Sequence, residues 1–525
     1  MANRRFPLVL GLVAVTLEAC LSLVIWLSAP PQTRWLGDTI QNSSDQAVYL
    51  SEILQGASGH LLLHNLYAVE SHAPRFDLVW STLGWIAQSG LSPLLIHEIA
   101  RWIFTILLAF AVYAAAASVA STERNAHLAS ILLFCGVGTG WIHSVALGMR
   151  HLWTPLTYTA PDLVTEFAIA PILMGGAHMI LSLALLVTGV RLTWNAWADR
   201  SSRTAWRASL VLGTLFLFHP YFVVLFGILC LIAFAWNCTG LSFPRFLRLA
   251  LPFAASILPA SAVYVPLFYD PVFRTHHLTA NILPLGGWAV WIATLFPFII
   301  ALVWRWKKRV ELKRSEYWLV AWTISAIIAM LLPLPWIRKL TEGLIIPCIL
   351  LTLPAWTALR DRLIKKPLSH LMSAALLLCA ALGPLHLFSS QLVWISKPDT
   401  KNWFYASQNL FDAWSALRTS SSPTSTIITS DDMWVNVWTP AYAERTTWVA
   451  HDHETPTFWD KRRQWQNLMT TADPVVANRI LDDAYITHLL TTSSSSAERF
   501  RKFLSPASWF VGFRSGSVTL FQRKD

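Results

Sequence analysis

Apolar runs long enough to cross a bilayer dominate this chain and constrain its fold more than any other feature. They measure roughly 17–25 residues each, the length that a membrane-spanning helix requires. Of the 525 residues, 54% are hydrophobic and only 13% are charged. This composition excludes a soluble enzyme carried on one anchor. It predicts an α-helical polytopic membrane protein with about eleven transmembrane helices.

Positive charge is concentrated in short loops between the apolar runs. Three of these loops, 191–207, 305–314 and 360–366, are rich in Lys and Arg. This is the positive-inside pattern, which sets the orientation of membrane proteins. The formal net charge of +11 therefore indicates topology and no nucleic-acid partner.

The runs and their flanking charges together predict where the spans lie. The first, 6–28, follows Arg4 and Arg5, which places the N-terminus in the cytoplasm. No small-residue cleavage site is visible, so we expect a retained helix. A break at His219 and Pro220 divides 208–236 into two short helices. The other spans are expected at 92–120, 126–147, 166–190, 247–268, 285–304, 317–333, 342–359 and 370–395.

Two regions are predicted to lie outside the membrane. The transmembrane domain, 1–395, includes a long first outer loop, 29–91, with juxtamembrane helices. Residues 396–525 are polar, contain the strand-like segments STIITS, THLLTT and GSVTLF, and begin with a helical stretch at 400–418. They predict a small extracytoplasmic α/β domain in which the TTSSSSAER run forms a surface loop.

The first outer loop contains the acidic residues that most suggest chemistry. Asp45 is followed by Tyr49 and Glu52, a spacing that places all three on one face of a short helix. Asp38 lies nearer the end of the first span and competes for the same role. A carboxylate at the outer membrane surface can take a proton from an acceptor. The alternative is a helix cap or a solvated loop residue.

Further polar residues on the predicted outer side widen the set of candidates. Arg338, Lys339 and Glu342 stand at the start of an apolar helix, where two cations can bind a lipid phosphate or snorkel to headgroups. Other candidates for phosphate binding are Arg150, His151, Arg274 and His276. Candidates for acceptor binding or for a second acid or base are Glu70, His72, Asp162 and Glu166, and Asp162 also fits a helix cap.

No residue pattern specifies a metal. Glu70 and His72 bracket one serine, but two residues do not make a metal site, and their spacing is not that of a zinc motif. The six cysteines lie in or beside predicted spans and form no CxxC pair. The cofactor is therefore unknown, with a divalent cation as an open alternative.

Several segments, taken in order, resemble the GT-C superfamily of polytopic glycosyltransferases. This group includes protein O-mannosyltransferases, aminoarabinose transferases and oligosaccharyltransferase catalytic subunits. The resemblance covers 1–395 and is carried by SSDQAVYLSEILQGASGHLLLHNLYAVESHAP, CGVGTGW, PDLVTEF, HPYF, DPVFRTHH and RKLTEGLIIP. It implies transfer of a sugar from a polyprenyl-phosphate carrier to a glycan, lipid or protein hydroxyl in the cell envelope. The implied catalytic base is an acid of the first outer loop, Asp45 or Asp38.

One departure from the superfamily pattern keeps other functions open. Gln46 follows Asp45, where better-known members have a second acid. This favours, as one alternative, a non-catalytic assembly protein with the same fold. The other alternative is a transporter or flippase for a lipid-linked glycan. Long outer loops and an outer domain argue against it, because alternating access does not need them.

Overall fold

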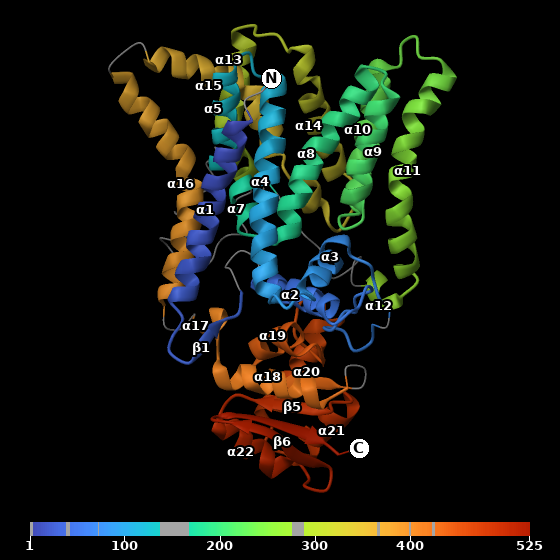
Figure 1. Ribbon diagram of the computed structural model, residues 1–525, viewed down its shortest axis with the longest axis vertical. Coiled ribbons are helices and arrows are strands. Elements are labelled where there is room, and N and C mark those ends of the chain that lie inside the picture. Colours follow the sequence, from blue (N-terminus) through green and yellow to red (C-terminus); the bar gives the residue numbers. More distant parts are fainter. Residues whose placement is uncertain are drawn as a thin grey trace. The chain divides into compact units, whose positions relative to one another are not determined.

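The structure, a computed structural model, describes residues 4–37, 43–71, 73–136, 167–275, 288–364, 368–397, 401–422 and 426–524. The chain divides into two compact units. The first unit consists of 1–21, 98–263 and 282–393, and the second unit of 22–97, 264–281 and 394–525. Figure 1 labels most of their helices and some of their strands.

The described residues of the first unit form helices and the turns between them. Its helices keep small and apolar side chains inside, such as Ala109, Val112 and Leu186, while large apolar side chains such as Leu107 and Leu210 are exposed. Exposed apolar surface of this kind fits a lipid environment. The helices lying wholly or mostly in this unit are α1 (Arg5–Leu27), α4 (Pro93–Val119), α5 (Glu123–Cys135), α7 (Ile169–Leu173), α8 (Ala177–Ala198), α9 (Ser202–Phe216), α10 (Phe222–Asn237), α11 (Phe243–Leu267), α13 (Trp288–Lys307), η3 (Arg314–Glu316), α14 (Tyr317–Met330), η4 (Ile337–Thr341), α15 (Ile345–Ile364) and α16 (Leu368–Ser396).

Within the described ranges, five helical segments are long and apolar enough to cross a membrane. They are Arg5–Leu27, Pro93–Val119, Ala177–Ala198, Phe243–Leu267 and Ile337–Asp361. The chain is therefore an integral membrane protein. The count of about eleven spans stays a prediction, because α5, α9, α10 and α14 are only 13 to 16 residues long.

Two helix breaks test the predicted span boundaries. The break at His219 and Pro220 is confirmed, since α9 ends at Phe216 and α10 begins at Phe222. The single span predicted at 166–190 is wrong in its bounds. Two glycines, Gly175 and Gly176, separate α7 from α8, and α8 continues to Ala198. The basic segment predicted as the loop 191–207 thus lies largely in α8 and α9.

Arg191 shows why α8 continues past the predicted end of its span. Its guanidinium Nη1 donates to the carbonyl of Ala114 at 2.8 Å, and Trp194 and Trp197 in the next turns are buried. The arginine is therefore satisfied inside the helical bundle and does not require a loop. The helix ends where Arg200 adopts a positive φ of 52°.

The second unit combines short helices with two sheets. Strand β1 pairs antiparallel with β2, which joins the segment after α1 to the segment after α16. The elements of this unit are β1 (Thr33–Trp35), α2 (Ser43–Ala57), α3 (Leu78–Ala87), α12 (Pro271–Thr275), α17 (Lys401–Phe404), β2 (Tyr405–Ser407), α18 (Gln408–Ser420), β3 (Ile427–Ser430), α19 (Met433–Ala443), β4 (Thr446–Thr447), α20 (Phe458–Thr470), α21 (Pro474–Asp483), β5 (His488–Thr491), α22 (Ser494–Phe503), β6 (Trp509–Ser515) and β7 (Val518–Arg523).

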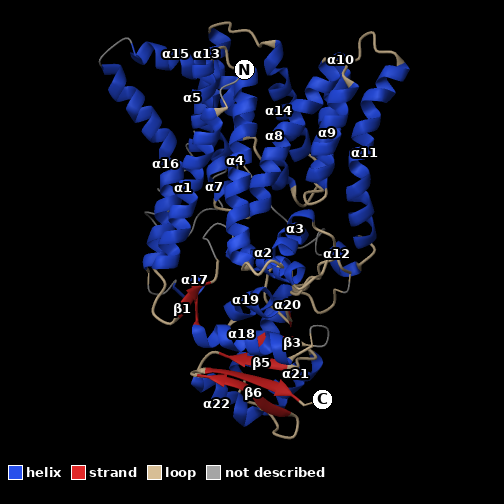
Figure 2. Cartoon of the chain, viewed as in Figure 1, coloured by secondary structure: helices blue, strands red, loops and turns tan. Residues whose placement is uncertain are grey.

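The larger sheet has the strand order β4-β3-β5-β7-β6. Strand β3 runs parallel to β4 and β5, whereas β7 runs antiparallel to β5 and β6. Figure 2 shows α18 and α22 on opposite sides of this sheet. The core beneath α20, α21 and α22 contains Leu468, Leu481, Leu489, Phe500 and Phe521. The predicted strands in STIITS, THLLTT and GSVTLF are confirmed.

Two details of the predicted outer domain are wrong. The TTSSSSAER run is not a loop, because Ser493 caps α22 by accepting the Ser496 N–H through its hydroxyl. Serine is a favoured N-cap residue, which explains a helix starting within a serine run. The helical stretch 400–418 is interrupted by β2, whose pairing with β1 is a long-range contact that local pattern does not reveal.

Helices α2 and α3 approach one another through glycines. A Cβ atom at Gly56 would lie 2.7 Å from the Cα of Gly84, and a Cβ at Gly84 would lie 2.5 Å from the Cα of Gly56. Real Cβ atoms do not reach such distances from backbone atoms, so both positions require glycine at this separation. The contact fixes α2, the helix that contains Asp45, against α3.

Candidate functional site

Asp45 lies in the first turn of α2, as the residue spacing predicted. Its side chain is 41% exposed, whereas the neighbouring Gln46 and Ala47 are buried. A negative charge in the first turn interacts favourably with the unpaired N–H groups of the helix start. The helix therefore holds an accessible carboxylate on a fixed backbone.

His451, in the loop after β4, is the partner of Asp45. Its Nε2 lies 3.1 Å from the Asp45 Oδ1, and its side chain is only 1% exposed. The His451 backbone N–H donates to Thr455 Oγ1 at 3.2 Å, which fixes the turn. Burial lowers the pKa of His451, but the hydrogen bond and charge of Asp45, together with the Glu454 and Asp452 carboxylates, raise it above its usual value.

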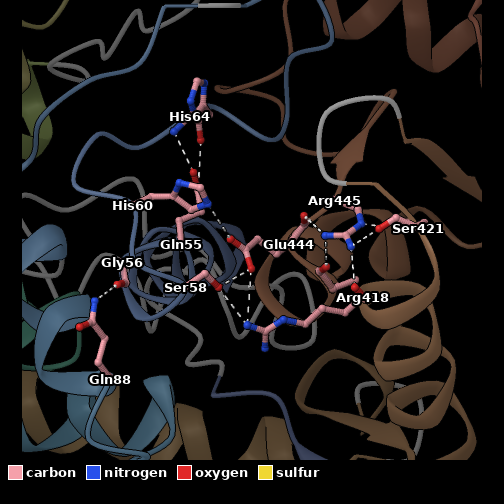
Figure 3. A network of polar contacts seen from close by, with 11 residues as sticks. Gln55, Gly56, Ser58, His60, His64, Gln88, Arg418, Ser421, Glu444 and Arg445 are labelled. Carbon is pink, nitrogen blue, oxygen red and sulfur yellow. Dashed lines mark hydrogen bonds and ion pairs between the residues drawn. The ribbon is translucent and has the colours of Figure 1, made fainter.

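The C-terminal end of α2 is anchored by a polar network (Figure 3). Ser58 Oγ donates to the Glu444 carboxylate at 2.6 Å, and Arg418 Nη2 lies 3.5 Å from the same carboxylate. Arg445 in turn donates to the carbonyls of Arg418 and Ser421 at 2.6 and 2.5 Å. Glu444 adopts a positive φ of 55° as the C-cap of α19. Both ends of α2 are thus held by residues of the C-terminal segment.

A partly buried ion pair holds the chain that follows α2. The guanidinium of Arg75 contacts the Glu52 carboxylate, and Arg75 also exchanges backbone hydrogen bonds with Leu63. Burial raises the pKa of Glu52 to about 7, although the charge of Arg75 acts in the opposite direction. Asp77 caps α3 by accepting the N–H groups of Val79 and Trp80. Glu52, which was predicted to share a helix face with Asp45, is therefore engaged in the ion pair with Arg75.

Three further contacts connect the loop before α3 to the C-terminal segment. Asn65 Nδ2 donates to Glu454 Oε2 at 3.2 Å, and Tyr67 donates its hydroxyl proton to the Val437 carbonyl at 3.1 Å. Burial and nearby carboxylates raise the pKa of Tyr67 well above its usual value, so it remains a donor. Glu70 lies 2.7 Å from Lys461 Nζ. Glu70 therefore forms an ion pair with Lys461 of α20.

A second polar cluster belongs to the first unit and contains Lys339. Its Nζ lies 5.3 Å from the centroid of the Tyr221 ring, a cation–π distance. The Tyr221 hydroxyl is 2.5 Å from His219 Nδ1, and the fully buried Glu342 carboxylate is 3.9 Å from the same nitrogen. His178 packs edge-on against His219 at 5.1 Å. The helix break at HPYF therefore brings aromatic and titratable groups to the segment that contains the predicted cations.

The structure places only part of the predicted site. Asp45 and Glu70 are in the second unit, as is Arg274, which is exposed at the end of α12. Half-buried Arg338 and Lys339, and buried Glu342, belong to the first unit. The predicted residues that lie outside the described ranges are Asp38, His72, Arg150, His151, Asp162, Glu166 and His276.

Sequence reasoning missed His451. A signal was present in the run HDHETP, 451–456, which contains four consecutive titratable side chains. Among the described residues, no group of three or more His, Cys, Asp or Glu side chains is arranged to hold a metal ion. What the geometry does offer is an oriented carboxylate with a buried imidazole behind it, an arrangement suited to accepting a proton.

Comparison with known proteins finds no matching protein-family model and no matching curated protein. Solved structures do match. Oligosaccharyltransferase AglB from Archaeoglobus fulgidus, in complex with an inhibitory peptide and a dolichol-phosphate, is 14% identical, with a TM-score of 0.46, covering 98% of this chain and 74% of that one. ArnT from Cupriavidus metallidurans, bound to undecaprenyl phosphate, is 12% identical, with a TM-score of 0.45, covering 97% of each chain.

A further structure of the Archaeoglobus fulgidus oligosaccharyltransferase, tethered to an acceptor peptide, is 13% identical and has a TM-score of 0.48. These proteins are GT-C membrane glycosyltransferases, the superfamily that the sequence resembles. Every one of these TM-scores lies below 0.5.

Proposed function

We propose that this protein is a membrane glycosyltransferase. It takes a sugar from a polyprenyl-phosphate carrier at the outer face of the membrane and passes it to a hydroxyl acceptor. The observation that carries the proposal is Asp45, whose accessible carboxylate is fixed on α2 and hydrogen-bonded to His451. The motifs of the first 395 residues support the same reading through their resemblance to the GT-C superfamily.

In the proposed reaction, Asp45 accepts the proton of the acceptor hydroxyl. The acceptor oxygen then forms a bond to the anomeric carbon, while the bond between that carbon and the phosphate oxygen breaks. The phosphate leaves with the electron pair and remains on the lipid. Arg338 and Lys339 neutralise its charge. A single in-line displacement of this kind inverts the anomeric configuration.

A non-catalytic assembly protein is the second candidate, and Gln46 favours it. Gln46 stands where better-known members of the superfamily have a second acid, and its amide Nε2 lies 3.0 Å from His97 Nδ1. Gln46 is also buried, so its side chain has a packing role. A protein that binds the lipid carrier without transferring sugar would fit this substitution.

Donor consumption distinguishes these two functions. Purified protein should be incubated with a panel of polyprenyl-phosphate-linked hexoses and pentoses and a mixed glycan and lipid acceptor pool, and released polyprenyl phosphate measured. We expect one donor of the panel to be consumed at a rate proportional to enzyme. Binding of polyprenyl phosphate with no donor consumed, by protein that remains folded, would contradict the transferase and support the assembly protein.

The orientation of the second unit's sheet domain is testable without substrate. Ser495 is exposed near the start of α22, and we expect a cysteine there to react with an impermeant maleimide in intact cells. A cysteine-free background is needed because the chain contains six cysteines. A cysteine at the exposed Lys308, in a loop predicted to be cytoplasmic, serves as control and should react only after permeabilisation. Protection of Ser495→Cys in intact cells would invert the proposed topology.

A further inference from the structure

His451 is bonded through both of its ring nitrogens. Nε2 faces Asp45 Oδ1 at 3.1 Å, and Nδ1 lies 3.1 Å from the backbone nitrogen of His453. A backbone N–H can only donate, so Nδ1 is the acceptor in that pair. The ring proton of a neutral histidine must then sit on Nε2, from which it is donated to Asp45.

The surroundings of His451 keep this arrangement rigid. The ring is buried, and the edge of Tyr67 packs against it with 5.9 Å between ring centroids. Nearby carboxylates favour a second proton on the ring, whereas the His453 N–H directed at Nδ1 opposes one. In both protonation states Nε2 carries a proton. The donation to Asp45 is therefore maintained whichever state prevails.

We infer that His451 is the positioning residue of Asp45, holding its carboxylate in one orientation for proton transfer. This inference rests on the proposed function, in which Asp45 is the base. His451 is separated from Asp45 by 406 residues, so the C-terminal segment completes a site that begins in the first outer loop. The sheet domain is, on this view, part of the catalytic apparatus and not an appended module.

Two substitutions separate positioning from support of the loop. His451→Gln keeps an N–H donor at about the reach of Nε2. His451→Asn keeps an acceptor at about the reach of Nδ1 and loses the contact with Asp45. We expect His451→Asn to lower kcat about 100-fold, the cost of a small misplacement of a reacting group. KM should stay unchanged, and the melting temperature should fall with the lost ring contacts while the variant stays folded. We expect His451→Gln to retain kcat within about threefold of the wild type, because the donor to Asp45 is kept.

These kinetics are measured with whichever polyprenyl-phosphate-linked sugar the wild type consumes, beside Asp45→Asn in the same assay. Loss of kcat in His451→Gln with full activity in His451→Asn would show a loop-supporting role and overturn the inference. Full activity in His451→Asn beside an inactive Asp45→Asn would overturn it while leaving the proposed function intact. Full activity in Asp45→Asn would show that Asp45 is not the base and would overturn the inference, whereas the consumed donor would still establish the transferase.

A spectroscopic measurement needs no substrate. In protein labelled with 15N-histidine and reconstituted in lipid, the His451 resonances are assigned by their absence from His451→Gln. We expect a protonated Nε2 that shifts in Asp45→Asn, since an amide is a weaker acceptor than a carboxylate. A proton on Nδ1 alone, or an Nε2 chemical shift that is unchanged in Asp45→Asn, would overturn the inference.

Discussion

Replacing Asp45 by asparagine should abolish sugar transfer while leaving the protein folded in the membrane. Loss of a general base costs roughly 10²–10⁴ in rate. In the variant, the asparagine Oδ1 can still accept the hydrogen bond from His451 Nε2. The aspartate Oδ1 now lies 3.1 Å from that nitrogen. The substitution therefore removes basicity with little change in shape. Initial rates of polyprenyl-phosphate release, with melting temperature in detergent, measure the two effects separately.

Two matched variants complete this experiment. Asp460→Asn makes the same chemical change at an exposed acid of α20 that pairs with Arg463, and it should keep wild-type rates. Asp38→Asn tests the other acid that the sequence proposed. If Asp45→Asn turns over normally and Asp38→Asn does not, the base is Asp38. If neither variant loses activity, neither acid is the base, and the proposed mechanism fails although the transfer activity stands.

Local patterns predicted the parts of the fold that depend on near neighbours. The spacing of Asp45, Tyr49 and Glu52 predicted α2. Proline at 220 predicted the break between α9 and α10, because proline removes a donor and clashes inside a helix. The break at Gly175 and Gly176 was missed, since glycine is common within membrane helices and marks a boundary less strictly than proline does.

Contacts between distant segments were beyond such reasoning. Pairing of β1 with β2, and of Asp45 with His451, joins residues several hundred positions apart, where periodicity carries no information. The same holds for the Glu444 contacts that anchor Ser58. The sequence could therefore indicate Asp45 as a candidate base. It could not indicate that the buried imidazole of His451 forms a hydrogen bond with Asp45.

Removing the two cations of η4, which precedes α15, should weaken binding of the lipid carrier. Arg338 and Lys339 lie in η4 on the predicted outer side, where the positive-inside pattern disfavours cations. The Lys339 ammonium lies over the Tyr221 ring, and the Tyr221 hydroxyl contacts His219. The ring that contacts the ammonium is therefore itself held in place. A hydrogen bond to a charged group contributes about 1.5–3 kcal/mol, which corresponds to about tenfold to hundredfold in affinity for each cation lost.

The measurement is equilibrium binding of a fluorescent polyprenyl phosphate to purified protein in nanodiscs. We expect Arg338→Ala to weaken binding by about tenfold or more, and Arg338→Lys to recover only part of it, because the charge remains but the planar fork is lost. Lys308→Ala removes an exposed cation elsewhere and should leave the affinity unchanged. We expect Arg338 to contribute to phosphate binding and little to folding stability, so the melting temperature should change little. Unchanged affinity in the double variant Arg338→Ala, Lys339→Ala would mean that the pair snorkels to headgroups. The phosphate site would then have to be sought at Arg150, His151, Arg274 or His276.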